Sequence, residues 1–186
     1  MIPIVSLWIP IVLSAVIVFV ASSIMHMMLT YHRSDYRKIP NEGAIREAVG
    51  KENLQPGVYF FPYMTSPSEM KSPEVIEKFT KGPVGHLTIR RSGPPAMGKN
   101  LVQWFLFSIV IGVFVAYLGG RFLAAGTHYL TVFRFAGTVA FMGYGVGQIM
   151  DSIWKGQPWG ATIKGLVDGF VYSLLTAGTF GWLWPK

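Results

Sequence analysis

Four long apolar stretches alternate with polar segments along this chain. Residues 1–32 and 100–120 contain no Asp, Glu, Lys or Arg, whereas residues 129–150 carry one such residue and residues 160–183 carry two. A helix of about 20 residues crosses a hydrocarbon layer of about 30 Å, so each stretch is long enough to span a membrane. The pattern predicts an all-α membrane protein with four transmembrane helices. Their expected ranges are 5–29, 101–119, 129–150 and 160–183.

A polar block between the first two apolar stretches divides the chain into three parts. We expect transmembrane helix 1 in residues 1–31, a cytoplasmic insertion in residues 32–99, and transmembrane helices 2–4 in residues 100–186. Eleven of the sixteen Lys and Arg residues lie between positions 33 and 99, several of them directly beside apolar segments. Basic residues that flank membrane helices remain in the cytoplasm, so both termini are expected outside.

The insertion has the turn and capping signals of a folded unit. Asn41 and Ser72 are suitable helix N-caps, and Pro73 follows as a first helical residue. Segments 58–61 and 86–90 have strand character. We therefore expect a small α+β unit with the order helix, strand, helix, strand. About 60 residues bury only a modest core, so the unit is expected to need the membrane helices or a partner for stability.

The composition agrees with a membrane protein and excludes several functions. Only 13% of the residues are charged and 51% are hydrophobic, whereas soluble domains have about 25% charged residues. The net charge of +7 is placed beside apolar segments, so it indicates topology rather than nucleic-acid binding. The absence of cysteine excludes disulfides, thiolate metal sites and cysteine nucleophiles. No basic residue precedes Arg33, and the first apolar stretch is too long for a signal peptide, so we expect it uncleaved.

A polar cluster is expected in the cytoplasmic half of the helix bundle. Lys164 and Asp168 are one helical turn apart, and their pairing would reduce the cost of placing charges in lipid. The residues expected to converge are His26, Gln148, Asp151, Lys164, Asp168 and Tyr172. This cluster is either a proton, cation or small-ligand site, or a satisfied polar network that fixes helix register while Lys164 extends to the surface.

Small residues recur at spacings of four in three of the predicted helices. Such spacing lets helix backbones approach closely within lipid. The residues are Gly112, Ala116, Gly120, Gly143, Gly147, Gly165 and Gly169. They serve either the internal packing of the bundle or a docking face for another membrane protein or a second copy of the chain.

Other motifs give weaker indications of a function. Met25-His26-Met27-Met28, with His32 nearby, suggests copper, but consecutive helical residues point in different directions, so we assign no metal and no cofactor. The segment 93–99 fits G-x-x-x-x-G-K, yet it has two prolines, and Asn100 stands where a phosphate loop needs Ser or Thr. The acidic residues of the insertion, Asp35 included, alternate with Lys and Arg and indicate a solvated surface. No catalytic pattern is present, and we do not expect an enzyme.

Four short segments carry a resemblance to other proteins. Segments 34–40, 70–74, 93–99 and 151–159 resemble parts of small multi-pass bacterial membrane proteins known only as hypothetical. The resemblance implies a bacterial inner membrane and brings no activity, ligand or catalytic residue with it.

Two functions from different classes follow from these observations. The leading hypothesis is a non-enzymatic accessory or scaffold subunit that lies in the lipid bilayer and binds a membrane-protein partner or a second copy of itself. The rival is a small proton- or cation-linked transporter or channel that uses the polar cluster. A membrane-bound enzyme is the third alternative.

Overall fold

The computed structural model describes all 186 residues, of which 69% are helical, with one two-stranded antiparallel sheet. The chain divides into two compact units. The first comprises Met1–Tyr36 and Ala96–Lys186 and is called the helical unit; the second, Arg37–Pro95, is called the polar unit. Residues 32–36, expected to belong to the insertion, pack with the helices instead because they form a turn against α7 (Trp159–Trp182).

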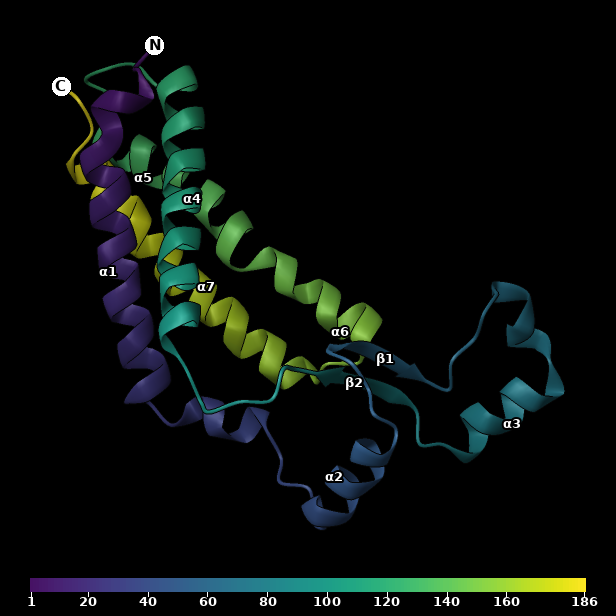
Figure 1. The fold of residues 1–186 in the computed structure, drawn as a ribbon. Helices are drawn as coiled ribbons and strands as arrows, with labels where there is room; N and C mark the ends of the chain where they lie inside the picture. Colours follow the sequence, from purple (N-terminus) through teal and green to yellow (C-terminus); the bar gives the residue numbers. More distant parts are fainter. The chain divides into compact units, whose positions relative to one another are not determined.

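The helical unit contains the long helices (Figure 1). Its elements are η1 (Ile4–Leu7), α1 (Trp8–Met27), η2 (Tyr31–Asp35), α4 (Gly98–Phe122), α5 (Tyr129–Tyr144), η4 (Val146–Gln148), α6 (Ile149–Lys155) and α7. Both termini lie at the same end of this unit (Figure 1). The Ile2 amide donates to the Gly120 carbonyl at 2.8 Å, and the Gly126 amide donates to the Pro185 carbonyl at 2.9 Å. These bonds tie the N-terminus to the last turn of α4 and the C-terminus to the α4–α5 connection.

The third predicted helix, 129–150, is wrong as a continuous element. The helix stops at Tyr144, passes through the 3-10 turn η4, and resumes as the short helix α6. Glycines weaken a helix because they lose the most conformational freedom on folding, and Gly143, Gly145 and Gly147 fall at this point. The Gln148 side-chain amide donates to the Tyr144 carbonyl at 2.8 Å, which replaces a hydrogen bond lost at the break.

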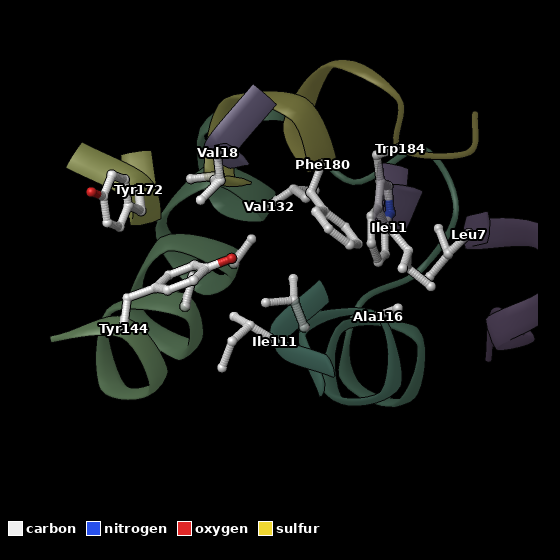
Figure 2. Close-up of a cluster of buried hydrophobic side chains, with 14 residues drawn as sticks. Leu7, Ile11, Val18, Ile111, Ala116, Val132, Tyr144, Tyr172, Phe180 and Trp184 are labelled. Atoms are coloured by element: carbon white, nitrogen blue, oxygen red, sulfur yellow. The ribbon is translucent and has the colours of Figure 1, made fainter. Parts of the chain in front are cut away.

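The core of the helical unit lies between its helices (Figure 2). Val132 of α5 and Phe180 of α7 are almost inaccessible, and Ile11 of α1 and Val115 of α4 belong to the same buried cluster. The largest helix–helix interface is that between α5 and α7. Only a narrow stripe of each helix is buried, so many large apolar side chains point outward.

Two helices, rather than the four predicted, have the length and hydropathy needed to cross a membrane. They are Ile4–Met27 and Gly98–Phe122. Only 33% and 28% of their most apolar segments are buried, whereas the core helix of a soluble protein would be mostly buried. α5 has 16 residues and is short for a span. α7 has 24 residues, but Lys164, Asp168 and several hydroxyl side chains make it less apolar.

The polar unit follows the predicted order of elements. It contains α2 (Glu42–Lys51), β1 (Gly57–Phe61), η3 (Pro67–Lys71), α3 (Pro73–Lys81) and β2 (Gly85–Ile89). The expected caps are confirmed. The Asn41 side chain accepts from the Ala44 amide at 3.1 Å, and the Ser72 hydroxyl accepts from the Val75 amide at 3.2 Å. The strands pair antiparallel, with Tyr59 opposite Leu87.

The polar unit has no hydrophobic core. None of its residues, Arg37–Pro95, is buried, and large apolar side chains such as Val58, Tyr63 and Ile76 are exposed. Hydrophobic burial is the main favourable contribution to folding, so this unit has little of the stabilisation that a self-sufficient domain of its size needs.

Candidate functional site

The centre of the candidate site is the carboxylate of Asp168, on the inner face of α7. Only 5% of this side chain is exposed. The Tyr31 hydroxyl donates to its Oδ1 atom, and His32 Nε2 lies 2.7 Å from its Oδ2 atom. His26 Nε2 lies 3.5 Å from the same Oδ2. A buried carboxylate without positive compensation is strongly unfavourable, so these neighbours determine which charge the site can hold.

The turn η2 brings two of these neighbours onto α7. Residues three apart lie above one another in a 3-10 helix, which places Asp35 beside His32. The Asp35 Oδ2 atom lies 2.6 Å from His32 Nδ1, so the imidazole stands between two carboxylates. The His32 ring also stacks on the His26 ring, with centroids 4.5 Å apart. His32 and Asp168 are 136 residues apart in the sequence, so only the tertiary fold brings them together.

The surroundings of η2 shift the pKa of three of its side chains, Tyr31, His32 and Asp35. Partial burial alone would lower the pKa of His32, but its hydrogen bonds to Asp35 and Asp168 raise that pKa above its ordinary value. Burial, followed by the hydrogen bond to Asp168, raises the pKa of the Tyr31 hydroxyl. The hydrogen bonds from Lys164 and His32 lower the pKa of Asp35. Asp35 therefore remains a carboxylate that holds the His32 ring in place.

The expected pairing of Lys164 with Asp168 is wrong. The Lys164 ammonium donates instead to Asp35 Oδ1 at 2.6 Å, to the Ser34 hydroxyl at 2.6 Å and to the Tyr31 carbonyl at 2.7 Å. The oxygens of Asp168 are already occupied by Tyr31 and His32, and the lysine side chain is long enough to reach the more exposed end of η2. Lys164 thus anchors the turn that forms the site.

A pocket of about 370 Å³ opens beside this cluster. Its wall includes Trp104, Tyr144 and Tyr172, whose rings contact one another with centroids 5.7–6.1 Å apart. The Tyr172 hydroxyl lies 3.3 Å from His26 Nε2, so this wall meets the polar cluster directly. Aromatic walls that meet convergent polar groups are a feature of small-ligand sites, and this pocket has both.

Five of the six predicted cluster residues meet at this place. His26, Gln148, Asp168 and Tyr172 line the pocket, and Lys164 holds its edge through Asp35. Asp151 does not take part: it lies on α6 and pairs with Lys155 at 2.6 Å. Asp151 was expected there because it follows the cytoplasmic end of the third apolar stretch, but α6 presents its carboxylate to Lys155 instead.

Three residues of the candidate site were not predicted from the sequence. Asp35 was assigned to a solvated surface, yet only 13% of its side chain is exposed. His32 entered only through the copper reading, and Tyr31 was not considered. The available signal was the His32-x-x-Asp35 spacing directly after an apolar helix, which suits a 3-10 turn with paired side chains.

The small residues lie mainly at contacts within the chain. A Cβ atom on Gly112 would touch Ile11, one on Gly143 would meet Ile111, and one on Gly165 would meet the Gln148 side chain. Three others also lie against neighbours: Gly120 approaches the Ile2 carbonyl, Gly169 approaches the Gly145 backbone, and Ala116 is fully buried. Gly147 has open space around it. Six of the seven therefore serve internal packing in this structure.

Comparison with known proteins adds no relative: no protein-family model, curated protein or solved structure matches this chain. A functional assignment therefore depends on the contacts within the chain itself. His26, His32 and Asp168 each offer one donor atom, and these three atoms all lie within 4.8 Å of one another. Nitrogen and carboxylate donors at this spacing can share protons or hold a cation.

Proposed function

We propose that this chain is a multi-pass integral protein of a bacterial inner membrane, with four spans. α1 and α4 are two of them. α7 is as long as a span, and its outward side chains Val167, Phe170 and Leu174 are apolar and exposed. The segment from α5 through η4 to α6 is the fourth, interrupted span.

The proposed orientation places both termini outside and residues 32–99 in the cytoplasm. Two observations support it. Both termini lie at one end of the helical unit, as an even number of crossings requires (Figure 1), and the basic residues flank the connection between α1 and α4. The sequence resemblance described above supports a bacterial inner membrane.

Within that membrane, the proposed role is that of a non-enzymatic accessory or scaffold subunit. One observation carries this proposal: no residue of Arg37–Pro95 is buried. A unit with formed helices and strands but no core gains stability when a partner covers its apolar side chains. The partner proposed is a protein on the cytoplasmic side of a larger membrane assembly.

The docking surface proposed for this partner is the apolar face of α3. Val75, Ile76 and Phe79 share that face, and together with Met64 and Met70 they line a groove of about 330 Å³. The opposite face carries the ion pairs of Lys78 with Glu74 and of Lys81 with Glu77, which keep it solvated. An amphipathic helix flanked by methionines is a common protein-recognition surface. The glycine faces are mostly occupied internally, so they are not proposed for docking.

Purification of the tagged chain from its native membrane in mild detergent tests this role. The expected result is a stable companion protein that the Ile76→Asp variant loses. Lys81→Ala is the matched control, because it changes the net charge by the same one unit on the solvated face of the same helix. Recovery of a lone species, or equal recovery of the companion with Ile76→Asp, would contradict the proposal.

The second candidate function is a small cation-linked transporter or channel. The observation that favours it is the placement of Asp168, a buried carboxylate in a membrane helix, beside an open pocket. Flux of labelled cations into liposomes that contain the purified chain separates the two candidates. Under this function Asp168→Asn abolishes flux while Asp151→Asn does not. Absence of flux in the unsubstituted chain would refute it.

A further inference from the structure

We propose that His26, His32 and Asp168 form a binding site for a divalent first-row transition-metal ion, with Zn²⁺ as the representative. Each of these residues has a ligand atom within 4.8 Å of those of the other two. The ligand atoms proposed are the Nε2 atoms of both histidines and Asp168 Oδ2. The ligands come from α1, η2 and α7, so the site exists only when these three elements are assembled.

The distances suit such an ion. Bonds of about 2.0–2.2 Å at tetrahedral angles separate two ligand atoms by about 3.3 Å. His26 Nε2 and Asp168 Oδ2 are 3.5 Å apart, which is close to that value. His32 Nε2 and Asp168 Oδ2 are 2.7 Å apart, so they would separate by roughly 0.6 Å to admit the ion. The His26 and His32 rings stack with centroids 4.5 Å apart, so the half-exposed His26 ring would also have to turn for both Nε2 atoms to face the ion.

The surroundings of His32 are those of a metal-binding histidine. Its Nδ1 atom is held by Asp35 at 2.6 Å, and Lys164 holds Asp35 at 2.6 Å on the other side. A carboxylate on the second ring nitrogen fixes the ring orientation and leaves the first nitrogen free to bind a metal. His26 has no strong partner of its own, since its nearest hydrogen-bonding group is the Tyr172 hydroxyl at 3.3 Å.

The kind of donor atom selects the class of ion. Mg²⁺ and Ca²⁺ prefer oxygen ligands, whereas two imidazoles with one carboxylate suit zinc and its neighbours in the first transition row. The methionines do not contribute a softer, copper-type site, because Met27 and Met28 are exposed and Met25 packs against the hydrophobic cluster. Three protein ligands leave a fourth position that faces the pocket, where water or a small ligand can bind.

Metal binding here is independent of the accessory role, since the polar unit can bind its partner whether or not an ion occupies the helical unit. If the chain transports cations, this site indicates that they are divalent first-row transition-metal ions. In that case the inference rests on the transporter function. Equilibrium binding and flux are separate measurements. A chain that binds Zn²⁺ without moving it across liposomes retains this inference and loses only the second candidate function.

The test uses the full chain, purified in mild detergent and treated with a chelator. Titration with Zn²⁺ by calorimetry is expected to give about one ion per chain, and Co²⁺ is expected to give the visible absorption of a tetrahedral nitrogen–oxygen site. Asp168→Asn and His26→Gln should each lower the affinity by at least an order of magnitude, and Asp35→Asn by roughly 10–100-fold. His26→Gln is the variant most certain to fold, because half of this side chain is exposed and it makes one weak hydrogen bond.

Two control variants change side chains of the same types as the proposed ligands, at positions outside the site. Asp151→Asn removes a carboxylate that is paired with Lys155, and His86→Ala removes an imidazole of the polar unit. Both should bind Zn²⁺ as the unsubstituted chain does. The proposal would be overturned if the unsubstituted chain showed no saturable Zn²⁺ binding, or if His26→Gln and Asp168→Asn both kept the Zn²⁺ affinity of the unsubstituted chain. The cluster would then be a proton-sharing network only.

Discussion

Replacing Gly169 by alanine places a methyl group where α7 crosses the broken end of α5. The added Cβ would lie 2.7 Å from Gly145 Cα, 2.9 Å from Gly145 N and 3.0 Å from the Tyr144 carbonyl carbon. All three atoms belong to the backbone, so no side chain can rotate away and the two helices must separate. Contact at about 3.5–4.0 Å requires a shift of roughly 1 Å.

The magnitude follows from two opposing effects. Overpacking of a tight contact costs about 1–3 kcal/mol, and the upper half of that range applies because the backbone must move. Alanine favours the helix over glycine by about 0.5–1 kcal/mol. The net destabilisation is therefore about 1–2.5 kcal/mol, which corresponds to a fall in Tm of roughly 2–10 °C for a chain of this length.

Thermal unfolding in detergent, followed by tryptophan fluorescence, measures this effect. Gly178→Ala is the matched control, because Gly178 lies on the same helix and its nearest neighbouring atom, Tyr129 Oη, is 3.9 Å from the added Cβ. The control should keep or raise the Tm. A Gly169→Ala protein that melts at or above the temperature of Gly178→Ala would refute the close contact between α5 and α7.

Three further predictions concern topology and the site. In sealed spheroplasts, a membrane-impermeant maleimide should label Ala125→Cys in the α4–α5 connection but not Ser68→Cys in the polar unit, against a cysteine-free background; the reverse pattern would invert the topology. Lys164→Met removes the ammonium that holds Asp35, and a partly exposed ion pair of this kind contributes about 1 kcal/mol. Trypsin cleavage in η2 should therefore accelerate about five-fold, and an unchanged cleavage rate would contradict the anchoring role of Lys164. Gln148→Leu leaves the Tyr144 and Gly165 carbonyls without their donor, which should cost about 1–3 kcal/mol and lower the Tm; an unchanged Tm would show that the break needs no such cap.

The elements that local chemistry specifies were predicted well. The caps Asn41 and Ser72 mark the starts of α2 and α3, and the alternation of residues 86–90 marks β2. Each of these signals is complete within about four residues, so no distant contact is needed to interpret it. The break at Gly145 was missed because hydropathy continues through it, and the hydrogen bonds that stabilise it come from Gln148 and from α7.

Only one wall of the candidate site could be predicted from the sequence, and the reason is physical. Lys164, Asp168 and Tyr172 repeat at helical spacing, so one wall could be assembled from periodicity alone. The other wall is a 3-10 turn whose side chains find their partners about 130 residues away, and no local pattern encodes that contact. A charged residue next to a membrane helix is usually solvated, and Asp35 departs from this because Lys164 extends out of α7 to meet it. The Lys164–Asp35 pair therefore adds to the bonds of Tyr31 and His32 with Asp168 in holding the turn on α7, and the cluster of His26, His32 and Asp168 depends on that contact.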